Sequence, residues 1–314
     1  MTSNATLTDQ DVREIYRRIS NWGRWGPDDE LGTLNYITPE KRCAAAALVR
    51  EGRAVGCGRI VDTAPSPMNN LPAHHHMVAA GDIAPASGSG VTYDQISIFP
   101  HGQAQSHIDA LCHITNDGRL YNDRPASLVT SQGARFGGMQ IARDGIASRA
   151  VLVDVAAARG VPYVEPDAPI RPADLDRALA LAGTEIGEGD ILIYRTGRHE
   201  RRAALGPQCE RLADGRGHLP GLSPDSLLWI HERKLALIGS DCAHDSLPSA
   251  FAEERIPIHV GTEVYMGLLL LHNLDLQPLC ATARELGRNE FFLTIAPLNI
   301  VGGTASPVNP IALF

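Results

Sequence analysis

The chain has 314 residues, of which 44% are hydrophobic and 20% charged, and its formal net charge is −8. This composition is typical of a globular protein with a substantial core. An acidic chain lacks the dense basic surface that phosphate backbones require, which argues against a nucleic-acid partner. No apolar run reaches the ~18 residues of a membrane span, and the N-terminus carries no apolar signal region. We therefore expect a cytoplasmic protein with no membrane partner.

Residues 1–53 predict an N-terminal helical extension. Thr8 is placed to cap a helix over residues 8–20, and Thr38 followed by a proline begins a second helix that continues to Gly52. The loop between them carries Trp22, Arg24 and Trp25. These side chains either bind an aromatic substrate or pack beneath their own loop.

The rest of the chain alternates between strand-like and helix-like segments. Strands are expected at 57–63, 95–99, 149–155, 190–196, 235–240 and 291–298, and helices at 171–183 and 223–234. This alternation predicts an α/β fold. No repeat or Ser/Gly-rich linker divides the sequence, so residues 1–314 are expected to form a single domain. The six cysteines are scattered without a C-x-x-C pair, which indicates reduced thiols.

The stretch HGQAQSHIDALCHI, residues 101–114, is the first candidate site. Side chains at i and i+2 on a strand share a face, so His107 and Asp109 converge there. Such a pair suits zinc or manganese, which accept nitrogen and oxygen donors. His113 lies six residues past His107 and can turn back near the ion without having to ligate it. The alternative is a structural role, with the histidine bonded to backbone and the aspartate capping a turn.

A second candidate cluster lies far along the chain, in RIPIHVGTEVYMGLLLLHNLDL, residues 255–276. The segment after His259 has helical character, and His272 closes an apolar run that predicts a buried strand. A polar residue in that place either points into a site or marks the transition from strand to loop.

These residues resemble the cyclase family of metal-dependent hydrolases, which includes bacterial kynurenine formamidase and isatin hydrolase. The family signature H-x-G-T-H-x-D-x-P-x-H is similar to residues 103–113, with Gln103 in place of the first histidine. Further similar blocks are residues 21–42, typical of a longer-chain branch, and residues 189–197, 235–245 and 296–307. The resemblance implies a swivelling β/β/α-type domain with a mixed sheet. It also implies assembly as a homodimer or homotetramer through N-terminal segments.

The resemblance also implies a set of ligands and a mechanism. His107, Asp109 and His272 are the expected metal ligands, and Gln103 is a possible weaker fourth ligand. His259 is expected either to bind a second ion or to contact a ligand of the first. His272 stands where the family has a glutamate that helps hold two ions, so we expect one Mn²⁺ or Zn²⁺. A divalent ion polarises a carbonyl and lowers the pKa of water, and His113 matches the family's general base.

The expected activity is hydrolysis of an amide-like C–N bond, in a formamide or cyclic amide or imide, or of a lactone. Two alternatives stay open: a metal-assisted cyclase or dehydratase acting on polyketide-like substrates, and a non-catalytic metal- or ligand-binding relative. His76, in the loop-like 74–76 triplet, is a candidate substrate contact or a solvated loop residue. Cys112 is expected to fill space in the core rather than act as a nucleophile.

Overall fold

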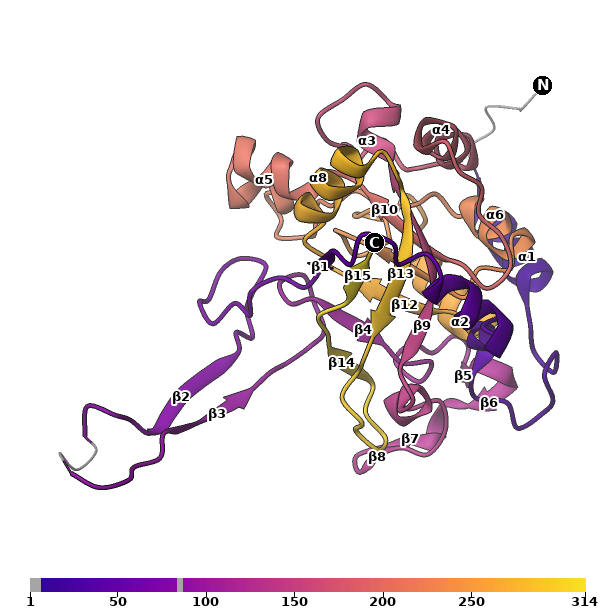
Figure 1. Ribbon diagram of the computed structural model, residues 1–314. Coiled ribbons are helices and arrows are strands. Elements are labelled where there is room, and N and C mark those ends of the chain that lie inside the picture. The colour runs from indigo at the N-terminus through magenta and orange to yellow at the C-terminus, as the bar shows by residue number, and fades with distance from the viewer. Residues whose placement is uncertain (1–6, 84–86) are drawn as a thin grey trace.

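The computed structural model describes residues 7–83 and 87–314, and a nine-stranded mixed sheet forms its centre (Figure 1). β9, β10, β11 and β12 pair in parallel, and the flanking strands pair antiparallel. In spatial order the strands are β1 (Ala54–Gly56), β15 (Ile311–Leu313), β13 (Glu290–Ile295), β9 (Ile146–Asp154), β10 (Ile191–Arg195), β11 (Leu237–Ser240), β12 (Leu269–His272), β4 (His107–Asp109) and β14 (Ala305–Pro307). This mixed sheet confirms the α/β prediction.

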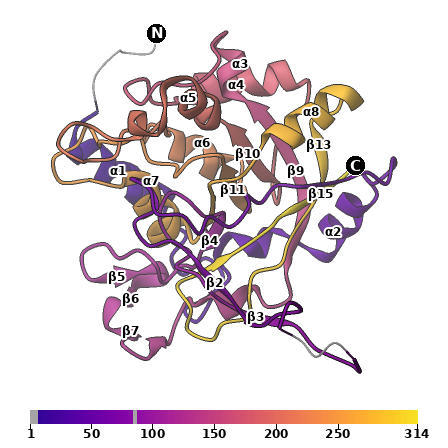
Figure 2. The same ribbon diagram turned by 90° about the vertical axis from the view of Figure 1, so that its left-hand side faces the viewer.

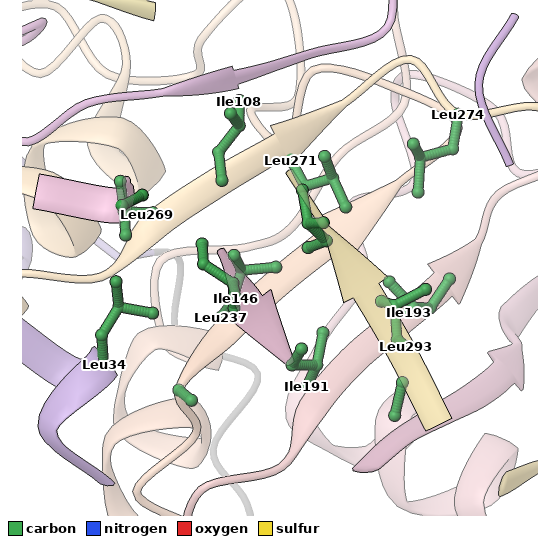
Figure 3. Close-up of a cluster of buried hydrophobic side chains, with 14 of the residues drawn as sticks. Leu34, Ile108, Ile146, Ile191, Ile193, Leu237, Leu269, Leu271, Leu274 and Leu293 are labelled. Carbon is green, nitrogen blue, oxygen red and sulfur yellow. The ribbon is translucent and has the colours of Figure 1, made fainter. Parts of the chain in front are cut away.

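The parallel strands are continuous apolar runs because both of their faces are covered. Alternate residues of each strand enter two different clusters. Ile191 and Ile193 of β10 belong to one cluster, whereas Leu192 and Tyr194 belong to the other. Figure 3 shows the first cluster, where side chains of β4, β9, β10, β11, β12 and β13 meet.

Helices supply the cover on both faces. α1 (Asp9–Ile19), α4 (Pro172–Ala182) and α6 (Ser226–Glu232) contribute to one cluster through Val12, Leu175 and Leu227. α8 (Gln277–Leu286) and the 3-10 helix η1 (Gly32–Tyr36) contribute to the other through Leu279 and Leu34. Figure 2 shows α1 and α6 together on one side of the molecule and α8 on the other.

The remaining elements are short. The helices are α2 (Pro39–Ala46), α3 (Val155–Ala158), α5 (Arg198–Leu205), α7 (Pro257–His259), the 3-10 helices η2 (Tyr121–Asp123), η3 (Ala126–Leu128), η4 (Met139–Ala142) and η5 (Pro207–Glu210), and the π-helix η6 (Val260–Met266). The strands are β5 (Arg119–Leu120), β6 (Arg124–Pro125), β7 (Val129–Thr130) and β8 (Gly133–Ala134).

Several predicted boundaries need correction. The strand expected at 57–63 is absent, because the backbone N–H of Gly58 donates to the Asn309 side chain at 2.9 Å instead of continuing the ladder that ends with β1. The helix expected up to Gly52 ends at Ala46, and β13 ends at Ile295, two residues before Pro297. α1 and α4 are confirmed almost to the residue.

β2 (His74–Ala79) and β3 (Tyr93–Ser97) form a separate hairpin that projects from the body of the molecule (Figure 1). The triplet 74–76, predicted to lie in a loop, is therefore part of a strand, and all three of its residues are exposed. Within residues 7–83 and 87–314, no helix combines the length and apolarity that crossing a bilayer requires.

Candidate metal centre

β4 and β12 bring the two candidate segments together. They pair antiparallel with His107 directly opposite His272, and the two imidazole rings stack with centroids 4.6 Å apart. Asp109 lies two residues after His107 on the same strand, so its carboxylate faces the same side. All three side chains are buried.

Asp109 lies at the centre of the cluster. Its Oδ2 is 2.8 Å from His272 Nε2, and its Oδ1 is 3.0 Å from His101 Nδ1 and 3.6 Å from His107 Nε2. Burial alone would raise the pKa of Asp109, but the surrounding imidazoles, His272 first, hold that pKa well below its usual value. The carboxylate is therefore charged at neutral pH.

Three overlapping triplets of donor side chains share Asp109. They are His107–Asp109–His272, His101–Asp109–His113 and Asp109–His259–Glu263. Within each triplet the potential ligand atoms lie within 4.8 Å of one another. This spacing lets one divalent cation contact all three side chains of a triplet.

Several of these buried atoms form no hydrogen bond, although His272 Nε2 and His101 Nδ1 lie within 3.0 Å of an Asp109 oxygen. Among the described residues, ten buried side-chain nitrogen and oxygen atoms have no hydrogen-bond partner, and six of the ten belong to this site. The six are His101 Nδ1, Gln103 Oε1, Asp109 Oδ1, His272 Nε2 and both carboxylate oxygens of Glu263. A buried unsatisfied polar atom costs roughly 1–3 kcal/mol, and a bound cation would remove that cost for the atoms that it contacts. The donor set of imidazole nitrogens and carboxylate oxygens fits zinc or manganese.

Hydrogen bonds on the far sides of two imidazoles orient them. His107 Nδ1–H donates to the backbone carbonyl of Gln105 at 2.9 Å, which leaves Nε2 free to face Asp109. His259 Nδ1–H donates to Asp245, whose carboxylate also accepts the backbone N–H of Ile258 at 2.8 Å. Burial lowers the pKa of His259, but the Asp245 carboxylate outweighs burial and raises it. Such contacts are typical of metal-bound histidines.

His113 lines the cavity beside the cluster. Its ring stacks on His101 with a centroid distance of 3.8 Å, and both rings line a cavity of about 230 Å³ that also exposes Asp109 and His272. Burial lowers the pKa of His113 to about 4. A neutral imidazole at neutral pH can accept a proton.

A buried arginine holds the loop that precedes β4. Arg198 is 1% exposed and donates to the Gln103 carbonyl at 3.0 Å, the Asn273 side chain at 2.7 Å and Glu210 at 2.6 Å. Asn273 in turn donates to the Gly102 and Gln105 carbonyls at 2.8 and 3.0 Å. These bonds tie the loop that carries Gln103 to the end of β12.

The structure gathers all six residues predicted as ligands or base around one cavity. Its lining includes Gln103, His107, Asp109, His113, His259 and His272. None of the four predicted substrate contacts belongs to this lining. Trp22 donates its indole N–H to the Val264 carbonyl at 2.7 Å, Arg24 packs over the Trp25 ring, and His76 lies on the projecting hairpin.

Sequence reasoning missed two members of the cluster, His101 and Glu263. His101 stands in the same motif but precedes β4, and it is brought in by the turn of the loop. Glu263 follows His259 by four residues, and side chains at that spacing on a helix share a face. The helical character of the segment was therefore a usable signal for Glu263.

Comparison with known proteins shows which family the chain resembles. The sequence model of the family described as "Putative cyclase" matches residues 35–244. The isatin hydrolase of Roseibium aggregatum is 32% identical over 146 residues, which cover 45% of this chain and 51% of that protein. The chain thus matches about half the length of this curated relative.

Solved structures extend the similarity over most of the chain. The crystal structure of a protein described as a novel cyclase is 31% identical, with a TM-score of 0.85 over 95% of this chain and 99% of its own. Isatin hydrolase A from Ralstonia solanacearum is 22% identical, with a TM-score of 0.60 over 88% of this chain and 97% of its own. This structure shares the fold. By the family match and by the first of these structures, the chain belongs to the putative cyclase family.

Proposed function

We propose that this protein is a metal-dependent hydrolase that cleaves an amide-like C–N bond, in a formamide or a cyclic amide or imide, or a lactone. The proposal depends above all on the buried donor atoms around Asp109 that have no hydrogen-bond partner. Atoms with a purely structural role would be paired by hydrogen bonds, so this cluster favours a bound cation. The curated relative named isatin hydrolase supports a cyclic amide as the first substrate to test.

In the proposed site, His107, Asp109 and His272 would hold one Mn²⁺ or Zn²⁺ ion, with Gln103 Oε1 as a weaker ligand. Such an ion would polarise the substrate carbonyl and lower the pKa of water. Asp109 supplies the negative charge, and the Gln105 carbonyl fixes the tautomer of His107. His259 is kept in place by Asp245 on the opposite side of the cluster.

His113 serves as the general base. It is neutral at neutral pH, so a ring nitrogen can accept the proton of the attacking water. The nearby Asp109 carboxylate favours the resulting imidazolium. The same proton can then pass to the departing nitrogen or oxygen, which completes hydrolysis without another acid.

The test combines metal analysis with a substrate screen. The purified protein should contain about one equivalent of Mn²⁺ or Zn²⁺ or more, and a His107→Ala/Asp109→Ala double variant should contain none. The native protein should hydrolyse at least one of isatin, N-formylarylamines, cyclic imides and lactones, and a chelator should stop it. Native protein that binds no transition metal and ignores chelator would refute the proposal. Metal binding without turnover of any of these classes would favour a binding protein or a cyclase.

We also propose that the chain assembles as a homodimer or homotetramer, with the hairpin of β2 and β3 as the contact in place of the N-terminal segments that the resemblance implies. An isolated two-stranded ribbon is only marginally stable in water. This one exposes Met77, Val78, Tyr93 and Ile96 to solvent. Contact with a second copy would bury them. Light scattering coupled to size-exclusion chromatography should show a dimer or tetramer, and Met77→Ser/Val78→Ser should weaken it; a monomeric native protein would contradict this proposal.

A further inference from the structure

A second cavity, of about 560 Å³, is lined by the segment that follows β1, by α5 and by the start of α8. Its lining includes Arg59, His199, Arg202 and Asp275, and it shares no lining residue with the cavity of the metal centre. This volume falls in the range of pockets that hold small molecules. The function proposed above gives this cavity no role.

Arg59 is a partly buried cation whose side chain contacts a neutral group. Its guanidinium Nη1 lies 3.0 Å from His199 Nδ1, and His199 donates its Nε2–H to the Leu274 carbonyl at 3.1 Å. Burial lowers the pKa of His199, and the charge of Arg59 lowers it further. The imidazole is therefore neutral at neutral pH, and it accepts a hydrogen bond from Arg59 without offsetting its charge.

The charges around Arg59 are unbalanced. Arg198 and Arg202 both pair with Glu210, at 2.6 and 3.3 Å. Arg59 has no such partner, since no carboxylate among the described residues forms an ion pair with it. Burial lowers the pKa of Arg59, and the like charges of Arg198 and Arg202 lower it further. The carboxylates of Glu210 and Asp275 act in the opposite direction without outweighing them, so an anion in the cavity would restore the balance.

We propose that Arg59 and Arg202 bind an oxyanion in this cavity, the carboxylate or phosphate group of a small molecule. A guanidinium presents its N–H groups as a planar fork that can donate two parallel hydrogen bonds to either group. His199 contacts Nη1 of Arg59, so Nη2 and Nε remain available for the anion. The inference goes beyond the proposed hydrolysis and does not depend on it, because no residue of the metal centre takes part.

Calorimetric titration of the full chain with phosphate and with benzoate, at constant ionic strength, tests this site. The native protein should bind at least one of the two probes, and the probe that binds more tightly identifies the group that the cavity prefers. Arg59→Gln should weaken that binding at least about tenfold, because it removes charge-assisted hydrogen bonds. Arg18→Gln, which removes an exposed arginine of α1, should leave the affinity unchanged.

Three outcomes of the titration overturn the site. They are a native protein that binds neither probe, equal affinities for the native protein and Arg59→Gln, and an equal loss of affinity in Arg18→Gln. An anion held by a metal ion would not respond to Arg59→Gln, so the comparison isolates this cavity. The His107→Ala/Asp109→Ala double variant should bind the probe as the native protein does, which keeps this test separate from that of the hydrolase.

A measurement on the native protein removes any dependence on how the variants fold. Crystals soaked in selenate, an oxyanion with an anomalous signal, should show a peak within about 4 Å of the Arg59 guanidinium. No selenate peak, or peaks at other positions only, overturns the site and leaves the hydrolase proposal intact.

Discussion

Arg198 and Gln103 are joined by a partly buried hydrogen bond of 3.0 Å from the guanidinium to the backbone carbonyl, although 95 residues separate them in sequence. The same guanidinium contacts Glu210 and Asn273. Arg198 thereby positions the loop before β4 without touching the cavity, since it is not among the cavity's lining residues.

Replacement of Arg198 should damage both stability and activity. Arg198→Met leaves the buried Glu210 with only its 3.3 Å contact to Arg202, and breaking a buried pair costs up to roughly 3–5 kcal/mol. Arg198→Met/Glu210→Gln should recover much of that free energy of unfolding, measured in urea. Because the Gln103 carbonyl stays unbound, the double variant should still show reduced turnover. Full recovery of turnover would show that Arg198 acts only through stability.

Replacement of His113 should separate catalysis from metal binding. His113→Ala should lower kcat by about 10²–10⁴-fold, the range typical of a lost general base, and keep the metal content of the native protein. Elemental analysis and a turnover assay on the same sample check both statements. If His113→Ala also lost the metal, His113 would be a ligand, as its triplet with His101 and Asp109 permits.

Asp245 should control metal affinity through His259. Asp245→Asn keeps the size of the side chain but weakens the bond that orients the imidazole, and such changes typically cost 10–100-fold in affinity. Competition with a chromogenic chelator measures the effect. Asp154→Asn, at the end of β9 and paired with Arg195, is a matched control that should leave affinity unchanged. Equal affinities for the two variants would contradict the orienting role.

Cys112 should be dispensable for turnover. Burial raises the pKa of its thiol to about 12, so little thiolate forms at neutral pH. Cys112→Ala should keep kcat within a few-fold of the native value, and iodoacetamide should not inactivate the folded protein. Loss of turnover in Cys112→Ala, with metal content and melting temperature unchanged, would make the thiol a catalytic group.

The metal-free protein should lose stability in mild acid. Burial lowers the pKa of His272 to about 3 and of His244 well below 6.5, whereas both imidazoles titrate near 6.5 in the unfolded chain. As the pH falls, the unfolded state therefore binds protons before the folded state does. The free energy of unfolding has its full value above pH 6.5 and declines below it. His259 and Glu263, each with a raised pKa, act in the opposite direction.

Urea unfolding after chelation, at pH 7.5 and at pH 5, measures this dependence. We expect the free energy of unfolding to be several kcal/mol lower at pH 5 than at pH 7.5. Each tenfold difference in proton affinity between the folded and unfolded states corresponds to ~1.4 kcal/mol. An unchanged or larger value at pH 5 would indicate that the imidazoles are already protonated in the folded protein.

The sequence predicts the core of the fold well because its signals there are local. Continuous apolar runs mark β9 to β12, and capping residues mark α1 and α4. The irregular segment after β1 could not be predicted, because the ladder ends through the side chain of Asn309, far away in sequence.

The site shows the same division between local and distant signals. The period of two along a strand places His107 beside Asp109, and the end of an apolar run marks His272. The partnership of Arg198 with Gln103 depends on how β10, β12 and the loop before β4 pack, and no local pattern reports it. The predicted substrate contacts of the N-terminal loop remain predictions. Glu263 could have been predicted from its helical spacing of four residues after His259.

The pairing of β4 with β12 has a consequence for folding. About half of the chain lies between His107 and His272 in sequence. Because β4 and β12 pair at these residues, a metal ion bound to both would act as a removable cross-link that closes a very long loop. Closing such a loop restricts the unfolded chain far more than the folded one. Resistance to heat and to proteases should therefore follow the supply of metal during synthesis.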